Sequence, residues 1–130
     1  MRRAALGAAL LVLAGGAAAE GVVMHVVVAD LPYARVWEAA LRAVEGTPIE
    51  RAADGLIVTG RVERPPRAEE AGFERVAERV TLRVEAFAER ITRVTVLVEA
   101  EGWRGGAWVP APDGAETARA IVDRLRAATG

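Results

Sequence analysis

The sequence predicts an α+β domain in which two helices pack on one face of an antiparallel sheet of about four strands, in the order β-α-β-β-β-α. Two observations lead to this class. Amphipathic helical patterns lie near both ends of the chain, and the block between them contains two adjacent runs in which apolar and polar residues alternate. A sheet with one apolar face is stabilised when amphipathic helices cover that face.

Residues 1–19 have the pattern of a cleaved export signal. Arg2 and Arg3 give a positive start, an apolar run follows over residues 4–14, and Ala17-Ala18-Ala19 suits a cleavage site before Glu20. The run is shorter than the roughly 20 residues of a spanning helix, and no cysteine is present to carry a lipid. We therefore expect an extracytoplasmic, periplasmic protein without a stable membrane anchor, and one domain over residues 20–130.

The composition of this domain argues against several classes of function. Without Arg2 and Arg3, 15 arginines face 18 acidic residues, a formal charge of −3 that gives no reason to expect a nucleic-acid partner. Ser and Cys are absent and His25 is the single histidine, which excludes Ser-His-Asp and Cys-His nucleophiles and a zinc site. We expect a non-catalytic protein without cofactor or metal.

The first strand and the first helix have clear patterns. Residues 22–30 form a β-branched run of strand length, and the lone His25 within it is interpreted as structural. Asp30 is expected to cap the helix that follows, and Gly46 with Pro48 to end it. Trp37 is expected to anchor this helix in the core. The apolar stripe of the helix consists of Val36, Trp37, Ala40, Leu41 and Val44.

The next segment combines a turn, a strand and a loop. Asp54-Gly55 is a turn signal, and residues 56–62 read as a strand that ends before Pro65-Pro66. Residues 67–74 are charged and lack a steady period, so we expect a mobile loop in which nothing positions Glu69 and Glu70.

Alternation is strongest over residues 79–100, which predicts an antiparallel hairpin with a break near Ala88-Glu89-Arg90. A region rich in Gly and Pro follows, with the option of a short strand at 107–109, and then a closing helix that starts with a capping-box pattern at Asp113 and Glu116. The sequence leaves the strand order open, including whether the first two strands are parallel neighbours. The residues expected to face the core are Val80, Leu82, Val84, Ala86, Val94, Val96, Val98, Ala100, Ala118, Ile121, Val122 and Leu125.

Residues 34–62, ARVWEAALRAVEGTPIERAADGLIVTGRV, resemble the start of small envelope domains related to the outer-membrane assembly lipoprotein BamC. The resemblance implies a helix-grip-like fold that makes protein contacts in the envelope without catalysis, and it supplies no binding residue. The chain departs from the family in having Asp54 and Gly55 contiguous and in lacking the lipid cysteine. The matching positions are Val36, Trp37, Ala39, Asp54, Gly55 and Ile57.

The segment WRGGAW contains the candidate partner-binding residues Trp103, Arg104 and Trp108, because Trp and Arg are enriched at interface hot spots. Alternatively, the glycines form a hairpin whose tryptophans fold over the edge of the core. The expected function is an accessory or scaffold domain that binds an envelope protein. The alternative is a carrier of a lipid or other small apolar ligand held between helix and sheet. The sequence leaves the oligomeric state open.

Overall fold

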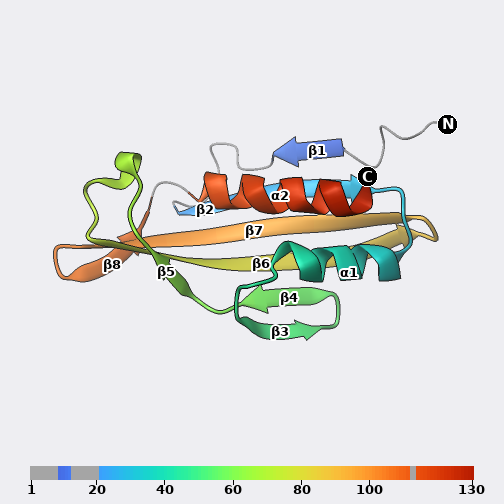
Figure 1. The fold of residues 1–130 in the computed structure, drawn as a ribbon, viewed down its shortest axis with the longest axis horizontal. Helices are drawn as coiled ribbons and strands as arrows, with labels where there is room; N and C mark the ends of the chain where they lie inside the picture. The colour runs from blue at the N-terminus through green and yellow to red at the C-terminus, as the bar shows by residue number, and fades with distance from the viewer. Residues whose placement is uncertain (1–8, 13–20, 112–113) are drawn as a thin grey trace.

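A computed structural model describes residues 9–12, 21–111 and 114–130 (Figure 1). Within these residues, the chain forms one antiparallel sheet, two α-helices and a short 3-10 helix. The strands are β1 (Ala9–Val12), β2 (Val22–Ala29), β3 (Ile49–Ala53), β4 (Leu56–Thr59), β5 (Val62–Arg64), β6 (Arg75–Ala88), β7 (Ile91–Arg104) and β8 (Ala107–Pro110); the helices are α1 (Tyr33–Ala43), the 3-10 helix η2 (Ala68–Glu70) and α2 (Ala115–Thr129).

The α+β class, the antiparallel sheet and the two helices are confirmed, but the predicted number of about four strands is wrong. Seven strands lie between Val22 and Pro110, and β1 adds another from within the predicted leader. Asp54 and Gly55, both with positive φ, join β3 to β4 in a two-residue hairpin. The single strand expected over residues 56–62 is divided, because β4 and β5 pair with different parts of the long β6.

The strand order is β1-β2-β7-β6-β4-β3, with β5 beside β6 and β8 beside β7. All of these pairs are antiparallel. Strand β2 therefore lies next to β7 and not next to β4, so the parallel arrangement of the first two predicted strands does not occur. The predicted hairpin is confirmed and is longer than expected, since β6 and β7 each contain 14 residues.

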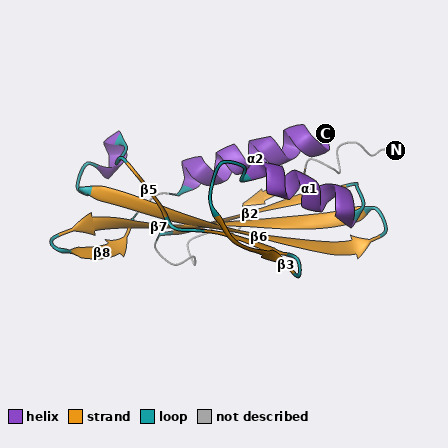
Figure 2. Cartoon of the chain, turned by 60° about the horizontal axis from the view of Figure 1, so that its bottom comes forward, coloured by secondary structure: helices purple, strands orange, loops and turns teal. Residues whose placement is uncertain are grey.

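Both helices cover the same face of the sheet (Figure 2). Helix α1 contacts β6 and β7, α2 contacts β2 and β7, and the helices contact each other. Trp37 packs against the main core but remains half-buried, so the expectation that it anchors α1 in the core holds in part. The N-cap of α1 is Pro32 without a side-chain cap bond, so the expected cap by Asp30 is wrong; Asp113 lies outside the described residues. Buried core residues under the helices include Val36, Ala40, Ile57, Leu82, Val94, Val96, Val98, Ile121, Val122 and Leu125.

We call the opposite side of the sheet, which neither helix covers, the open face. Along β7, buried residues alternate with half-buried or exposed ones, so Thr95, Leu97 and Trp103 are on the open face while Val96 and Val98 face the helices. Every residue of the two buried clusters lies between Val27 and Leu125. The part of the chain after the predicted leader thus contains both cores. No helix among the described residues is long and apolar enough to cross a membrane.

Candidate functional site

Two tryptophans meet on the open face at the end of the sheet formed by β7 and β8. Gly105 and Gly106, both with positive φ, make the tight turn between these strands. The register sets Trp103 directly opposite Trp108. Their ring centroids are 5.4 Å apart with an interplanar angle of 70°, the edge-to-face geometry that aromatic quadrupoles favour. The turn chemistry therefore positions a rigid aromatic pair.

Two arginines from neighbouring segments lie over this pair. The Arg61 guanidinium carbon is 4.2 Å from the centroid of Trp108. That of Arg75 is 5.1 Å from the Trp108 centroid and 5.8 Å from the Trp103 centroid. These distances are within the range of cation–π attraction. We call Arg61, Arg75, Trp103 and Trp108 the Trp–Arg patch.

Acidic side chains orient both arginines of the Trp–Arg patch. Arg75 donates hydrogen bonds of 2.9 and 2.6 Å to the two carboxylate oxygens of Glu63. This contact holds the pKa of Glu63 below its usual range and raises the pKa of Arg75. Arg61 pairs with Glu101 at 3.2 Å. These contacts hold the two guanidinium groups over the tryptophans before a partner binds. Less side-chain entropy is therefore lost on binding.

Of the three predicted site residues, the structure brings Trp103 and Trp108 together and separates Arg104 from them. Successive side chains of a strand point to opposite faces, and Arg104 lies on the helix side, 4.8 Å from the ring centroid of Phe73. Phe73 packs on Gly102, where a Cβ atom would collide with the ring. Arg104 therefore packs over a small second core that contains Phe73 and Val76.

A shallow hollow of about 300 Å³ lies beside the Trp–Arg patch. Its lining includes the small residues Gly21, Ala77 and Ala100 and charged residues of both signs. The hollow and the Trp–Arg patch share Arg61. This mixture of small and charged residues suits an extended or protruding group of a partner that makes both apolar and polar contacts. The charged residues lining it are Arg61, Arg79, Glu99 and Glu101, together with Glu78, whose carboxylate is bonded to Thr117 of α2 on the helix side.

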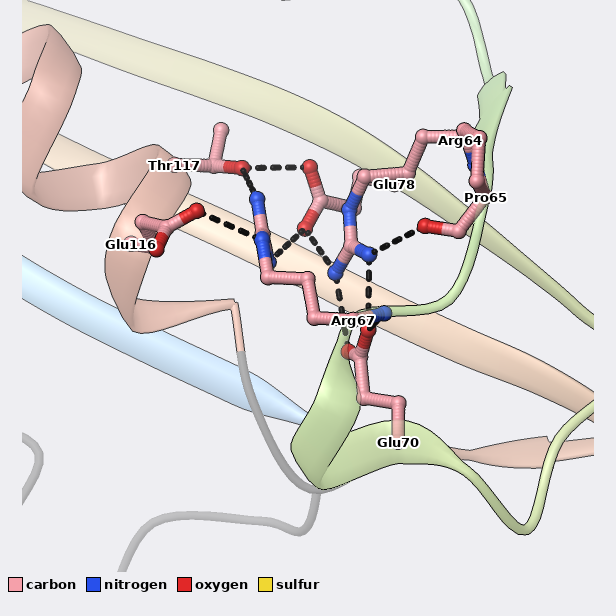
Figure 3. Close-up of polar contacts among 7 residues, drawn as sticks. All are labelled: Arg64, Pro65, Arg67, Glu70, Glu78, Glu116 and Thr117. Carbon is pink, nitrogen blue, oxygen red and sulfur yellow. Dashed lines mark hydrogen bonds and ion pairs between the residues drawn. The ribbon is translucent and has the colours of Figure 1, made fainter.

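A buried ion network fixes the segment between β5 and β6 (Figure 3). The Glu70 side chain is fully buried and accepts hydrogen bonds of 2.7 and 2.8 Å from Arg64. It also accepts one of 2.8 Å from the backbone N–H of Arg67. These bonds lower the pKa of Glu70. The expectation that nothing positions Glu70 is therefore wrong.

The same network reaches the sheet and helix α2. Arg64 donates a hydrogen bond of 3.0 Å to one carboxylate oxygen of Glu78 in β6. The other carboxylate oxygen of Glu78 accepts a hydrogen bond of 2.6 Å from the hydroxyl of Thr117 in α2 (Figure 3). Arg67 pairs with Glu116 at 2.6 Å. The backbone N–H of Glu74, at the end of this segment, donates to the carbonyl of Trp103. The segment expected to be a mobile loop is thus tied to α2, to β6 and to the strand that presents the Trp–Arg patch.

His25 is 8% exposed and faces the helices. Burial, followed by the nearby positive charge of Arg119, lowers its pKa, so the imidazole is neutral at pH 7. Within the described residues, acidic and histidine side chains form no group of three that could hold a metal ion.

Comparison with known proteins gives no match, either to a protein-family model or, at a significant level, to a curated protein.

Proposed function

We propose that this protein is a non-catalytic binding domain of the bacterial cell envelope, exported to the periplasm, and that the Trp–Arg patch contacts its protein partner. The single observation that carries this proposal is the preassembled set of two tryptophans and two stacked arginines on the sheet face opposite α1 and α2. Trp and Arg are the residue types most enriched at interface hot spots. The resemblance to BamC-like envelope domains supports the same role.

The decisive experiment replaces the aromatic pair. We expect the double variant Trp103→Ala with Trp108→Ala to keep its fold and to lose the partner that co-purifies from the envelope fraction. The matched control is Phe87→Ala, because Phe87 is an exposed aromatic, 58% accessible, that also has an arginine over its ring, with Arg93 at 4.5 Å. A specific polypeptide retained by Phe87→Ala and lost from the double variant supports the proposal. Retention by the double variant, or its unfolding, contradicts it.

A second candidate function is transport of a small apolar ligand. A groove of about 330 Å³ opens between the end of α1, the start of α2 and the residue Val80. Its wall combines apolar side chains with Arg67 and Arg124, as a site for an amphiphile with an acidic head would. Native mass spectrometry of protein purified gently from the envelope tests this function, because a carrier retains an added mass of a few hundred daltons. Ala120→Trp fills the groove and should abolish that mass. The remaining lining residues are Ala43, Val44, Thr47, Glu116, Thr117, Ala120 and Ile121.

A further inference from the structure

The outer edge of β2 carries no residue that protects an edge strand. The strand reads VVMHVVVA, without charge, glycine or proline. Natural sheets protect exposed edges with charged residues, prolines, bulges or very short strands, because unpaired backbone groups recruit other strands. The other lateral edge strand, β3, contains Glu50 and Arg51, and β8 ends in Pro110. Of these edges, the outer edge of β2 therefore has the greatest tendency to pair with another strand.

The hydrogen-bond geometry shows which groups of β2 point outward. The N–H of Ala100 donates to the carbonyl of Gly21, which makes these two residues a hydrogen-bonded pair across β2 and β7. Hydrogen-bonded and non-hydrogen-bonded pairs alternate along an antiparallel ladder. The residues opposite β7 in non-hydrogen-bonded pairs thus direct their N–H and C=O groups away from β7. These residues are Val22, Met24, Val26 and Val28.

In the full chain, β1 lies on this edge. Strand β1 pairs antiparallel with β2, from Ala9 opposite Val28 to Val12 opposite His25. All of β1 falls within residues 1–19, which the sequence pattern marks for removal. Loss of the leader would therefore take away the strand that now covers half of β2, while both buried cores stay with the mature chain.

We propose that, once residues 1–19 are removed, a second copy of the chain takes the place of β1 and that two β2 strands pair antiparallel about a two-fold axis. The second copy supplies an uncharged strand of eight residues with the same outward pattern of donors and acceptors. Antiparallel pairing of identical strands satisfies two-fold symmetry. An axis perpendicular to the sheet keeps all helices on one face and produces one continuous sheet.

This dimer rests on the predicted leader cleavage and is independent of the Trp–Arg patch. The tryptophans lie where β7 pairs with β8, beyond the part of β7 that pairs with β2. A dimer formed through β2 leaves the Trp–Arg patch accessible. A mature monomer would therefore leave the proposed partner surface standing, and a Trp–Arg patch that binds no partner would leave the dimer standing. Retention of residues 1–19 would count against both the dimer and the proposed export.

The test uses protein exported by its host and purified from the envelope fraction, with its intact mass defining the first residue. Light scattering coupled to size exclusion then gives the oligomeric state of the wild type and three variants. Met24→Pro removes one outward N–H without touching the bonds to β7. Met24→Ala is its matched control, because it removes the side chain and keeps the N–H. Leu97→Lys places a charge on the open face directly beside Met24 but one strand inward.

We expect the intact mass to show a chain that begins at Glu20. In solution, the wild type, Met24→Ala and Leu97→Lys should have the mass of a dimer, and Met24→Pro should be a folded monomer. In the wild-type dimer, the amide hydrogens of Val26 and Val28 should exchange slowly with solvent. The proposal is overturned by a mature wild-type monomer, by retention of residues 1–19, or by rapid exchange of these two amides. It is also overturned if Met24→Pro remains dimeric, or if Leu97→Lys is monomeric, because the latter assigns association to the open face. If Met24→Pro fails to fold, the solution mass of the wild type and the exchange rates of the Val26 and Val28 amides decide between dimer and monomer.

Discussion

Arg64 and Glu70 form a two-pronged ion pair, with hydrogen bonds of 2.7 and 2.8 Å from the two terminal guanidinium nitrogens to the two carboxylate oxygens. The Arg64 side chain is 17% exposed and that of Glu70 is fully buried. Because a buried pair has lost its hydration, removal of one partner leaves the other charge poorly compensated. The stability of the segment between β5 and β6 is therefore expected to depend on this pair.

Glu70→Gln should lower the free energy of unfolding by about 3 kcal/mol, because it leaves Arg64 less compensated in a buried site. Urea denaturation measures this loss. The neighbouring exposed residue offers a matched control, and Glu69→Gln should change stability by no more than about 0.5 kcal/mol. Equal stability of the two variants would contradict the structural role of Glu70.

Acid should weaken the fold through Glu70. Its folded-state pKa lies below the ordinary value of 4.5, chiefly because of the hydrogen bond from Arg64. The unfolded chain therefore binds the proton more readily, so this contribution is complete above pH 4.5 and is lost as the pH falls through the lower folded-state pKa. Urea midpoints measured between pH 7 and pH 3 should fall most steeply below 4.5, and the slope should be shallower for Glu70→Gln.

His25 should titrate below its ordinary pKa of 6.5, because burial disfavours the charged imidazole. The unfolded state then binds a proton first, and stability decreases as the pH falls from 6.5 towards the folded-state pKa. The chain has a single histidine, so one imidazole resonance in an NMR titration gives the value. A midpoint at or above 6.5 would show that the side chain is solvated or paired with an acid.

Gly102→Ala should destabilise the protein by about 1–3 kcal/mol, because the added methyl group collides with the ring of Phe73. Thermal unfolding followed by circular dichroism measures the loss. Gly72→Ala is the control, since the nearest atom to its new methyl group is an Arg104 guanidinium nitrogen at 3.8 Å. If both variants are equally stable, Phe73 does not pack on Gly102 as described.

Partner binding should distinguish two arginines near the tryptophans. Arg75→Ala is expected to weaken binding about 3- to 10-fold, because it removes the cation–π contacts of the Trp–Arg patch. Arg104→Ala should have little effect, because Arg104 lies on the helix side of the sheet. Titration of each variant against the partner captured by the wild type measures both effects, and a stronger effect at Arg104 would assign binding to the other face.

Local periodicity predicted the helices and the central hairpin well, because their buried faces repeat over many residues. Strand β3 has no such signal: all five of its residues are exposed, so only pairing to β4 makes it a strand. The division of residues 56–62 into two strands also depends on a distant segment, since Thr59 accepts a hydrogen bond from the N–H of Val80. Such long-range pairing leaves no regular pattern in the local sequence.

The sequence predicted the two tryptophans of the candidate site but not the arginines that contact them. Trp103 and Trp108 were chosen by composition, whereas Arg75 joins them through the register of β6 with β7. An irregularity between Ala86 and Ala88 sets that register, and a shift of one residue would move Arg75 to the opposite face. Arg104 could have been separated from Trp103 by strand alternation alone. The Arg64–Glu70 pair spans a six-residue separation without a recognisable motif.

The edge-to-face contact of Trp103 with Trp108 also gives the protein an intrinsic circular-dichroism signal. Two indoles with centroids 5.4 Å apart couple their electronic transitions, which produces paired circular-dichroism bands of opposite sign in the far ultraviolet. The third tryptophan, Trp37, instead stacks on Tyr33 in α1. The signal from coupling between two indoles therefore reports on the β7–β8 hairpin, and occupancy of this end of the sheet can be followed without a label.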